Sequence, residues 1–145
     1  MAQQDACALL DDDHKKVEQL FMQYQAADPP RKNQLAQTIC HELTVHTQIE
    51  DEIFYPAVRK ATGDNQLVDE AKHEHDEARQ LIRQVEQGQA SEQLMTALQQ
   101  AIEHHVGEER SRMFPKARQA SGLDLVQLAQ QLEARKSELI AAHPA

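Results

Sequence analysis

An all-α fold is predicted by the sequence: an antiparallel up-down-up-down four-helix bundle with an additional C-terminal helix. Gly, Pro and aromatic residues are scarce, and the rest of the composition is dominated by residues that form helices readily. Apolar residues recur at helical spacing along most of the chain. With 145 residues the chain is long enough for one core, so we expect a single domain over residues 1–145 with a bundle core at about 8–120.

The first two helices follow from apolar stripes and the residues that interrupt them. Apolar positions at helical spacing predict a helix over about residues 8–27, which ends at Asp28 and the two prolines after it. A second helix is expected from about Arg31 to Gly63, a residue that suits a helix C-terminus. Pro56 lies inside this helix, and because proline removes one backbone hydrogen bond, we expect a kink or an early end there.

The remaining helices are bounded by similar signals. A third helix is predicted over about residues 64–87, with Gly88 behind it. Ser91 is the expected N-cap of a fourth helix, which meets Pro115 as the second meets its own proline. After a break, an amphipathic stripe predicts the additional helix over about residues 123–142.

Two short stretches share one pattern. Residues 46–56 read HTQIEDEIFYP and residues 105–115 read HVGEERSRMFP, with His, Glu, a large apolar pair and Pro at the same offsets. We interpret this parallel as an internal duplication. Since residues four apart share one helix face, whatever buries the apolar residues is expected to bury the His and the Glu as well.

Hairpin geometry brings four histidines together. A turn centred on residue 30 sets His14 level with His46, and a turn centred on residue 90 sets His75 level with His105. A middle turn near residue 60 also sets the second and third of these histidines level. Each helix therefore delivers one imidazole to a single layer, with a glutamate one turn further on in the second and fourth helices. The candidate metal ligands are His14, His46, Glu50, His75, His105 and Glu109.

The alternative to a metal site is ordinary packing. A single buried histidine is usually a hydrogen-bonded core residue, and a single buried glutamate usually has an Arg or Lys partner. Four imidazoles and two carboxylates in one layer, with no Lys or Arg at core positions nearby, would carry a severe desolvation cost unless a cation compensated it. Mixed His and Glu ligands in a bundle core indicate a dinuclear site, and imidazole suits iron, zinc, copper and nickel, of which we favour iron. Another di-iron design repeats Glu-x-x-His, which here occurs once, from Glu70 to His73, off the apolar stripe.

The other histidines are not expected to be ligands. His73 lies two residues from His75, on the opposite helix face, and is expected to be exposed. His41 is expected to be exposed or to support a ligand, while His104 flanks the apolar stripe and His143 lies in the tail.

Two further features are interpreted as structural. Tyr24 and Tyr55 could approach the site as hydrogen-bond donors to its ligands, but packing in the core with the hydroxyl group at the rim is the expectation that we favour. The acidic run Asp11 to Asp13 is interpreted as a solvated end of the first helix, where negative charge suits the helix dipole.

The motifs in this order resemble the hemerythrin-like HHE cation-binding family. That family has a His early in the first helix, His-x-x-x-Glu in the second, a His in the third and His-x-x-x-Glu in the fourth. The resemblance covers about residues 8–120. Here the motifs read DDDHKKVEQLF around His14, HELTVHTQIEDEIFYP around His46 and Glu50, KHEHDEARQLI around His75, and HHVGEERSRMFP around His105 and Glu109.

The resemblance implies two non-haem iron ions with a bridging oxo or hydroxo species, able to bind dioxygen or to react with it. It implies that the first two histidines hold one iron, the last two the other, and that Glu50 and Glu109 bridge them. One position departs from the pattern. Oxygen-carrying hemerythrins have a second histidine one turn before the third-helix histidine, and here that position is Ala71. The resemblance therefore implies sensing, redox chemistry or iron handling as well as oxygen carriage.

Charge and cysteine content indicate the partners, the cellular location and the thiol state of the protein. A net charge of -9 without a Lys/Arg cluster argues against nucleic acid and membrane partners. No apolar run is long enough for a membrane span, and the N-terminus lacks the pattern of a signal peptide, so we expect a cytoplasmic location. Cys7 and Cys40 are expected to remain free, because the hairpin geometry separates them by roughly 20 Å; we expect Cys40 to be packed and Cys7 to be the more reactive, near a fraying end.

Three functions remain open from the sequence. The first is a protein that binds or senses dioxygen or a related small oxidant, which we prefer to an enzyme. The second is a di-iron oxidoreductase that handles peroxide or nitric oxide, or an iron-handling protein, and it would need an external reductase. The third is a structural protein in which the C-terminal segment forms a partner surface. For that segment, packing against the bundle as a fifth helix is the simpler expectation.

Overall fold

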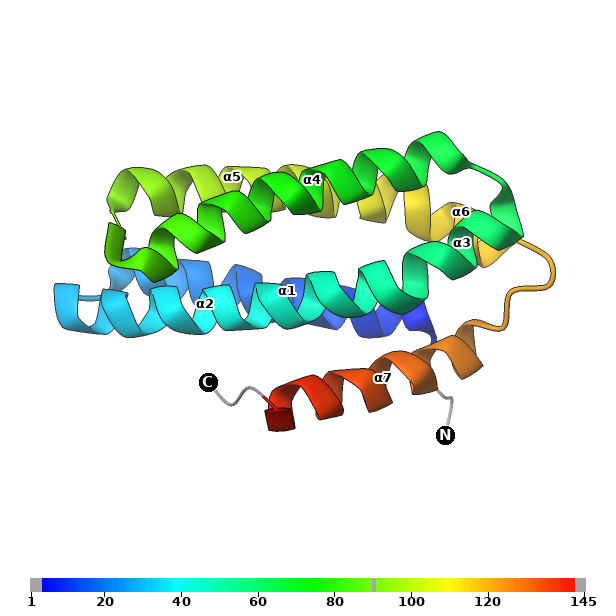
Figure 1. Ribbon diagram of the computed structural model, residues 1–145, viewed down its shortest axis with the longest axis horizontal. Coiled ribbons are helices and arrows are strands. Elements are labelled where there is room, and N and C mark those ends of the chain that lie inside the picture. The colour runs from blue at the N-terminus through cyan, green and yellow to red at the C-terminus, as the bar shows by residue number, and fades with distance from the viewer. Residues whose placement is uncertain (1–3, 90, 143–145) are drawn as a thin grey trace.

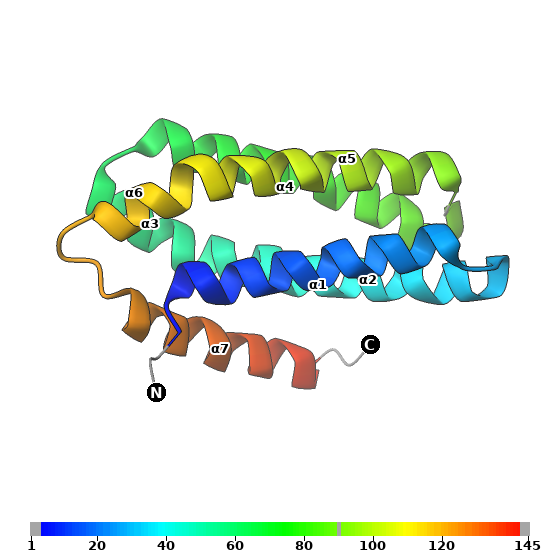
Figure 2. The same ribbon diagram turned by 180° about the vertical axis from the view of Figure 1, so that it is seen from behind.

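The computed structural model describes residues 4–89 and 91–142 and confirms the all-α prediction. Four long helices form an antiparallel bundle, and the C-terminal helix lies along the side formed by α1 and α2 (Figures 1 and 2). These elements are α1 Ala6–Ala26, α2 Pro29–Ile49, α4 Asn65–Gln84, α5 Glu92–Glu108 and α7 Leu125–Ala142.

Polar side chains fix the starts of the four bundle helices. Asp5, Asp28, Asp64 and Ser91 each accept a hydrogen bond from the backbone N–H three residues later, as N-caps do. The predicted start of the second helix at Arg31 is therefore two residues late. The two prolines occupy its first turn, where a missing N–H costs nothing.

The expected kinks near the two prolines take the form of π-helical turns. Glu50–Phe54 joins α2 to α3, Tyr55–Thr62, and Glu109–Met113 joins α5 to α6, Phe114–Gln119. In both turns the residue before the proline donates its N–H five residues back, to the carbonyl of the glutamate. The wider turn accommodates a proline without ending the helix. The two sequence stretches that share a pattern thus also share this backbone turn.

The apolar core falls into two parts, with the predicted histidine layer between them. One part includes Leu10, Ile49 and Val68, and the other includes Val17 and Leu43. Because the layer lies at mid-bundle, its polar groups are enclosed by apolar side chains at both ends.

The C-terminal helix packs against the bundle as a fifth helix, which is the simpler expectation for this segment. Leu128, Leu132 and Leu139 of α7 are buried in the same part of the core as Leu9 and Leu10 of α1. On its polar side, Arg135 pairs with Glu52 at 2.8 Å. α7 is thus held to the bundle by both apolar and charged contacts.

Both cysteines are free and buried, and burial raises the pKa of each thiol to about 12. The predicted free thiols and the packed position of Cys40 are confirmed. The expectation of a reactive Cys7 near a fraying end is wrong, because Cys7 is fully buried and its Sγ lies 3.9 Å from the carbonyl oxygen of Phe114. A buried thiol with a raised pKa forms little of the reactive thiolate.

None of the helices in residues 4–89 and 91–142 combines the length and the apolar character that crossing a membrane requires.

Candidate metal centre

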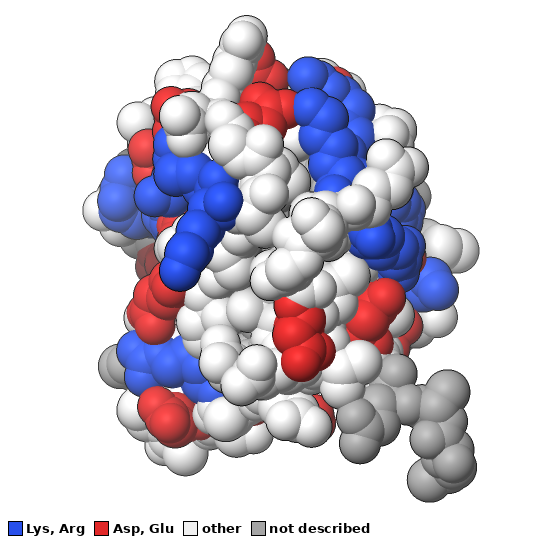
Figure 3. Space-filling view, turned by 90° about the vertical axis from the view of Figure 1, so that its right-hand side faces the viewer, with Lys and Arg blue, Asp and Glu red and all other residues white. Residues whose placement is uncertain are grey.

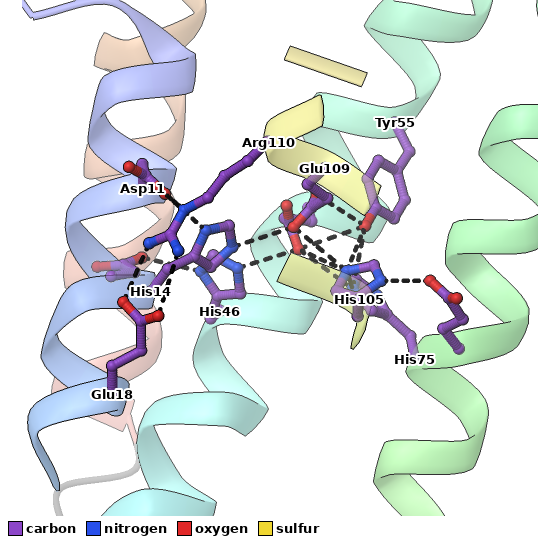
Figure 4. A network of polar contacts seen from close by, with 12 residues as sticks. Asp11, His14, Glu18, His46, Tyr55, His75, His105, Glu109 and Arg110 are labelled. Atoms are coloured by element: carbon purple, nitrogen blue, oxygen red, sulfur yellow. Dashed lines mark hydrogen bonds and ion pairs between the residues drawn. The ribbon is translucent and has the colours of Figure 1, made fainter. Parts of the chain in front are cut away.

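The four predicted histidines and two glutamates meet in one buried layer (Figure 4). Each of the six side chains is at least 95% buried, and one histidine comes from each of α1, α2, α4 and α5. The glutamates lie at the first residue of each π-helical turn, one turn after the histidine of the same helix. The residues brought together are His14, His46, Glu50, His75, His105 and Glu109.

The histidines form two pairs. The ring centroids of His14 and His46 are 4.8 Å apart, and those of His75 and His105 are 4.6 Å apart. Within the second pair the two Nε2 atoms are separated by 3.0 Å. The first pair therefore joins α1 to α2 and the second joins α4 to α5.

Each glutamate lies between the two pairs. Oε1 of Glu50 is 3.1 Å from Nε2 of His46 and 3.1 Å from Nε2 of His75. Oε1 of Glu109 is 3.0 Å from Nε2 of His14 and 3.3 Å from Nε2 of His105. Both carboxylates thus connect one histidine of the first pair with one of the second, which is the arrangement that two bridging ligands require.

A carboxylate on the far side of each ring turns every Nε2 toward the centre. The Nδ1 atoms of the four histidines lie 2.7 to 3.1 Å from these acceptors. An Nδ1–H donated to a carboxylate fixes the tautomer and leaves Nε2 free to bind a cation. The pairs are His14 with Asp11, His46 with Asp13, His75 with Asp51, and His105 with Glu74.

The interpretation of the acidic run as a solvated helix end is wrong for two of its three residues. Asp13 is 92% buried between His46 and Lys136 of α7, whose Nζ lies 2.6 Å from Oδ1. Asp11 is half-buried and accepts from both His14 and Arg110. Asp11 and Asp13 therefore support imidazoles of the centre, while Asp12 is exposed.

A basic side chain stands behind each supporting carboxylate. Arg110 reaches Asp11 at 2.6 Å and also pairs with Glu18, as Figure 4 shows. Arg79 pairs with Asp51, and Nε2 of His104 lies 3.1 Å from Glu74. With Lys136 on α7, these groups extend the network from the centre to the surface on four sides.

Tyr55 belongs to the centre, so the favoured expectation of a hydroxyl group at the rim is wrong. Its hydroxyl is fully buried, not at the rim, and it donates to Oε2 of Glu109 at 3.1 Å. It also lies 3.1 Å from Nε2 of both His75 and His105. Burial and the charges of Glu109 and Glu50 hold the pKa of this phenol well above its usual value, so it keeps its proton.

In the absence of a cation, His46 of the centre is protonated at neutral pH. Burial by itself would lower the pKa of His46, but the charge of Glu50 and hydrogen bonds to Asp13 and Glu50 raise it to about 10. Burial would raise the pKa of Glu50, but the charge of His46 and hydrogen bonds around it keep it well below the usual range. The imidazole therefore carries a proton at pH 7 that a metal ion has to displace.

Four atoms of the layer have no hydrogen-bond partner in the described part of the chain. They are buried nitrogen and oxygen atoms, which otherwise find partners in more than nine cases in ten. Nε2 of His14 and Oε1 of Glu109 lie 3.0 Å apart without a hydrogen bond between them, and a cation bound by these atoms would satisfy them. The atoms are Nε2 of His14, Nε2 of His46, Oε2 of Glu50 and Oε1 of Glu109.

His73 and His104 lie where the sequence predicts, and His41 is half-buried. His73 is exposed, with Nε2 3.0 Å from Glu77, while His75 is buried. His104 is exposed and supports Glu74 rather than the centre directly. His143 lies outside the described residues.

Replacing Asp13 by asparagine is expected to lower the metal affinity of the centre about 10- to 100-fold, the usual effect of losing a partner that orients a ligand histidine. The amide removes the negative charge between His46 and Lys136. Chelator competition measures the affinity, and Asp12→Asn, a change at the exposed neighbour, is the matched control. Equal affinity in the two variants would show that Asp13 has no such role.

The fold and the layer define a helical bundle with a buried cluster of histidines and carboxylates able to hold cations. The pattern of the hemerythrin HHE cation binding domain family matches residues 5–117. The chain belongs to this family, as the resemblance of its motifs implies.

Two known proteins are similar to this chain. A DNA nickase from Nostoc sp. (strain PCC 7120 / SAG 25.82 / UTEX 2576) is 30% identical over 133 residues, which are 88% of this chain but 38% of that protein. The chain thus spans well under half the length of this relative. The crystal structure of a hemerythrin HHE cation binding domain-containing protein from Mycobacterium kansasii has a TM-score of 0.77 at 24% identity, covering 96% of this chain and 89% of that one. This likeness shows the fold.

Proposed function

We propose that the chain is a non-haem di-iron protein that binds or senses dioxygen or a related small oxidant. The observation that carries the proposal is the presence of two buried groups of potential ligands with one member in common. The ligand atoms in each group lie within 4.8 Å of one another. One group is His14, His46, Glu50 and Glu109, and the other is Glu50, His75 and His105.

The donor set supports iron. Imidazole with carboxylate suits non-haem iron, and two carboxylates placed between two histidine pairs suit a pair of ions rather than one. On this proposal His14 and His46 hold one ion, His75 and His105 hold the other, and Glu50 and Glu109 are shared. Two iron ions, when bound, would supply the redox chemistry with dioxygen or peroxide.

A small apolar space beside the layer supports a small, uncharged ligand. It has a volume of about 10 Å³, next to His14, His46 and His105, and its apolar walls include Val17 and Ile102. The same two apolar residues also line a surface pocket of about 220 Å³. A space of this size admits one small molecule, and its walls offer little to a charged one.

The chain places one hydroxyl hydrogen at the centre. The hydroxyl of Tyr55 donates this hydrogen to Glu109 and lies against two histidines, so it would donate a hydrogen bond to a ligand at the centre only by turning away from Glu109. The supporting carboxylates hold the imidazoles in place while this happens.

Metal analysis combined with visible spectra of anaerobic and air-exposed protein tests the proposal. We expect about two iron ions per chain and an absorption spectrum that changes on exposure to air. Protein that retains zinc and no iron after expression in iron-supplemented medium, or iron whose spectrum does not respond to air or to peroxide, would contradict it.

Loading of the metal-free protein is expected to release protons. The pKa of His46 is about 10 in the folded protein and about 6.5 in an unfolded chain, so its pairing with carboxylates stabilises the metal-free fold below pH 6.5 and ceases to do so as the pH rises through 10. Between these values a metal ion displaces the proton, and the apparent affinity should increase with pH. A pH-stat titration with Fe²⁺ at pH 8 under nitrogen measures the release. Loading without any proton release would show that the layer is not protonated as inferred.

A further inference from the structure

A groove with acidic walls runs along α4 and α5, the helices that lie side by side in Figure 1. Its volume is about 750 Å³. Among the described residues that line it, the only Lys or Arg is Arg112, which pairs with Glu108 at 3.0 Å and with Glu70 at 3.6 Å. Five carboxylates line the groove: Asp69, Glu70, Glu74, Glu77 and Glu108.

The groove continues inward to the metal centre. A smaller space of about 10 Å³ shares Glu70, Glu74 and Glu108 with the groove, and its inner walls include His105 and Glu109. This is about the volume of one water molecule or one small ion. Two proposed ligands are therefore reached from the surface between α4 and α5.

A buried acceptor stands at the inner end of this path. Glu109 is 99% buried and lines the inner space, and its Oε1 lies 3.0 Å from Nε2 of His14 and 3.3 Å from Nε2 of His105 without accepting a hydrogen bond. Ala71, the position where oxygen-carrying relatives have a histidine, forms another wall. Its small side chain leaves open a route that an imidazole would fill.

Among the described residues, the groove has no set of ligand atoms close enough together to hold a cation in place. In the described part of the chain, sets of three or more His, Cys, Asp or Glu ligand atoms within 4.8 Å of one another occur only in the centre itself. The groove acids are spread along its walls, so they attract a cation without enclosing it. Acids spread in this way raise the local cation concentration and the rate of association.

Charges of both signs lie at the end of the bundle where α3 and α6 finish. Figure 3 shows Lys and Arg side chains on either side of this end, with Asp and Glu side chains among them. The last turns of these two helices carry Arg59, Lys60, Lys116 and Arg118, of which Arg59 pairs with Asp69, Lys116 with Asp64 and Arg118 with Asp5. Along the groove, by contrast, five carboxylates face one arginine.

We propose that divalent cations reach the centre through the acidic groove between α4 and α5, passing Glu70 and Glu108 on the way to Glu109 and His105. This rests on the proposed metal centre. It assigns the groove a role in loading that is separate from the affinity of the loaded centre.

Loading kinetics of the full-length, metal-free protein test the path. Fe²⁺ is added under nitrogen at low ionic strength, the reaction is stopped with a ferrous chelator, and retained iron is measured against time. The double variant Glu70→Gln/Glu108→Gln should load at least about threefold more slowly than wild type and reach the same final iron content. The difference should shrink as salt is added, because salt screens exposed charges.

Two further variants make the result specific. Arg112→Gln removes positive charge from the groove and should load faster than wild type, an effect opposite in sign that misfolding would not produce. Glu86→Gln/Glu133→Gln removes the same charge from exposed positions outside the groove and should load at the wild-type rate.

The outcomes separate the two proposals. If wild-type protein takes up no Fe²⁺, the proposed function fails. If it loads but both groove variants load at the rate of the control, the path is wrong while the centre stands. A groove variant with an unchanged rate and a lower final iron content would also contradict the path, since it would place these acids among the groups that hold the metal.

Discussion

Glu50→Gln is expected to remove metal from both halves of the centre. Its carboxylate lies 3.1 Å from a histidine of each pair, and it is the one residue common to both groups of ligand atoms found in the described chain. Losing a partner that merely orients a ligand costs roughly 10- to 100-fold in affinity, so losing a shared ligand should cost about a hundredfold or more for at least one ion.

The control for this variant is Glu52→Gln, an exposed change in the same π-helical turn. Both proteins are loaded with Fe²⁺, dialysed against a weak chelator and analysed for iron per chain. We expect the control to keep the wild-type content. If Glu50→Gln also keeps two coupled ions, the carboxylate does not bridge them.

Metal removal is expected to destabilise the fold substantially. An ion that binds only the folded chain stabilises it by about 4 kcal/mol when its free concentration is a thousand times its Kd. For a chain of this length that corresponds to a fall in Tm of roughly 10 °C when the ion is removed. Thermal unfolding with and without chelator measures the difference.

Two histidine variants on α4 provide the comparison. His73→Ala removes an exposed side chain, so its Tm should respond to chelator as the wild type does. His75→Ala removes a buried ligand, and its response should be reduced or lost. A wild-type Tm unaffected by complete metal removal would contradict this prediction. It would mean that hydrogen bonds within the layer, and not a metal ion, stabilise it.

The histidine layer could be predicted from the sequence because it depends on helix register. Helical spacing and turn positions determine which residues are level, and small errors at helix ends leave that register unchanged. The second helix begins two residues earlier than predicted, yet His46 still lies beside His14.

The supporting network could not be predicted in the same way, because its members act across helices. Asp13 is next to His14 in sequence but supports His46, and Glu74 is next to His75 but supports His105. The available signal was an acid beside a ligand residue, which is equally typical of a solvated helix face. Helical spacing allows Tyr55 either to reach the centre or to pack with its hydroxyl group at the rim. It does not contain the π-helical turn that precedes Tyr55, so it could not decide between the two.

The contribution of α7 likewise depends on a long-range contact. Lys136 lies 2.6 Å from Asp13, far away in sequence, and its position follows only once the C-terminal helix is placed on α1 and α2. The apolar stripe predicts that this helix is buried on one side but does not specify the helices that it covers.

Anomalous diffraction from crystals of iron-loaded protein, collected on either side of the iron absorption edge, locates the ions directly. We expect two iron peaks inside the bundle, one beside His14 and His46 and the other beside His75 and His105, with Glu50 between them. A single peak, or iron only at surface positions such as the groove between α4 and α5, would contradict this expectation.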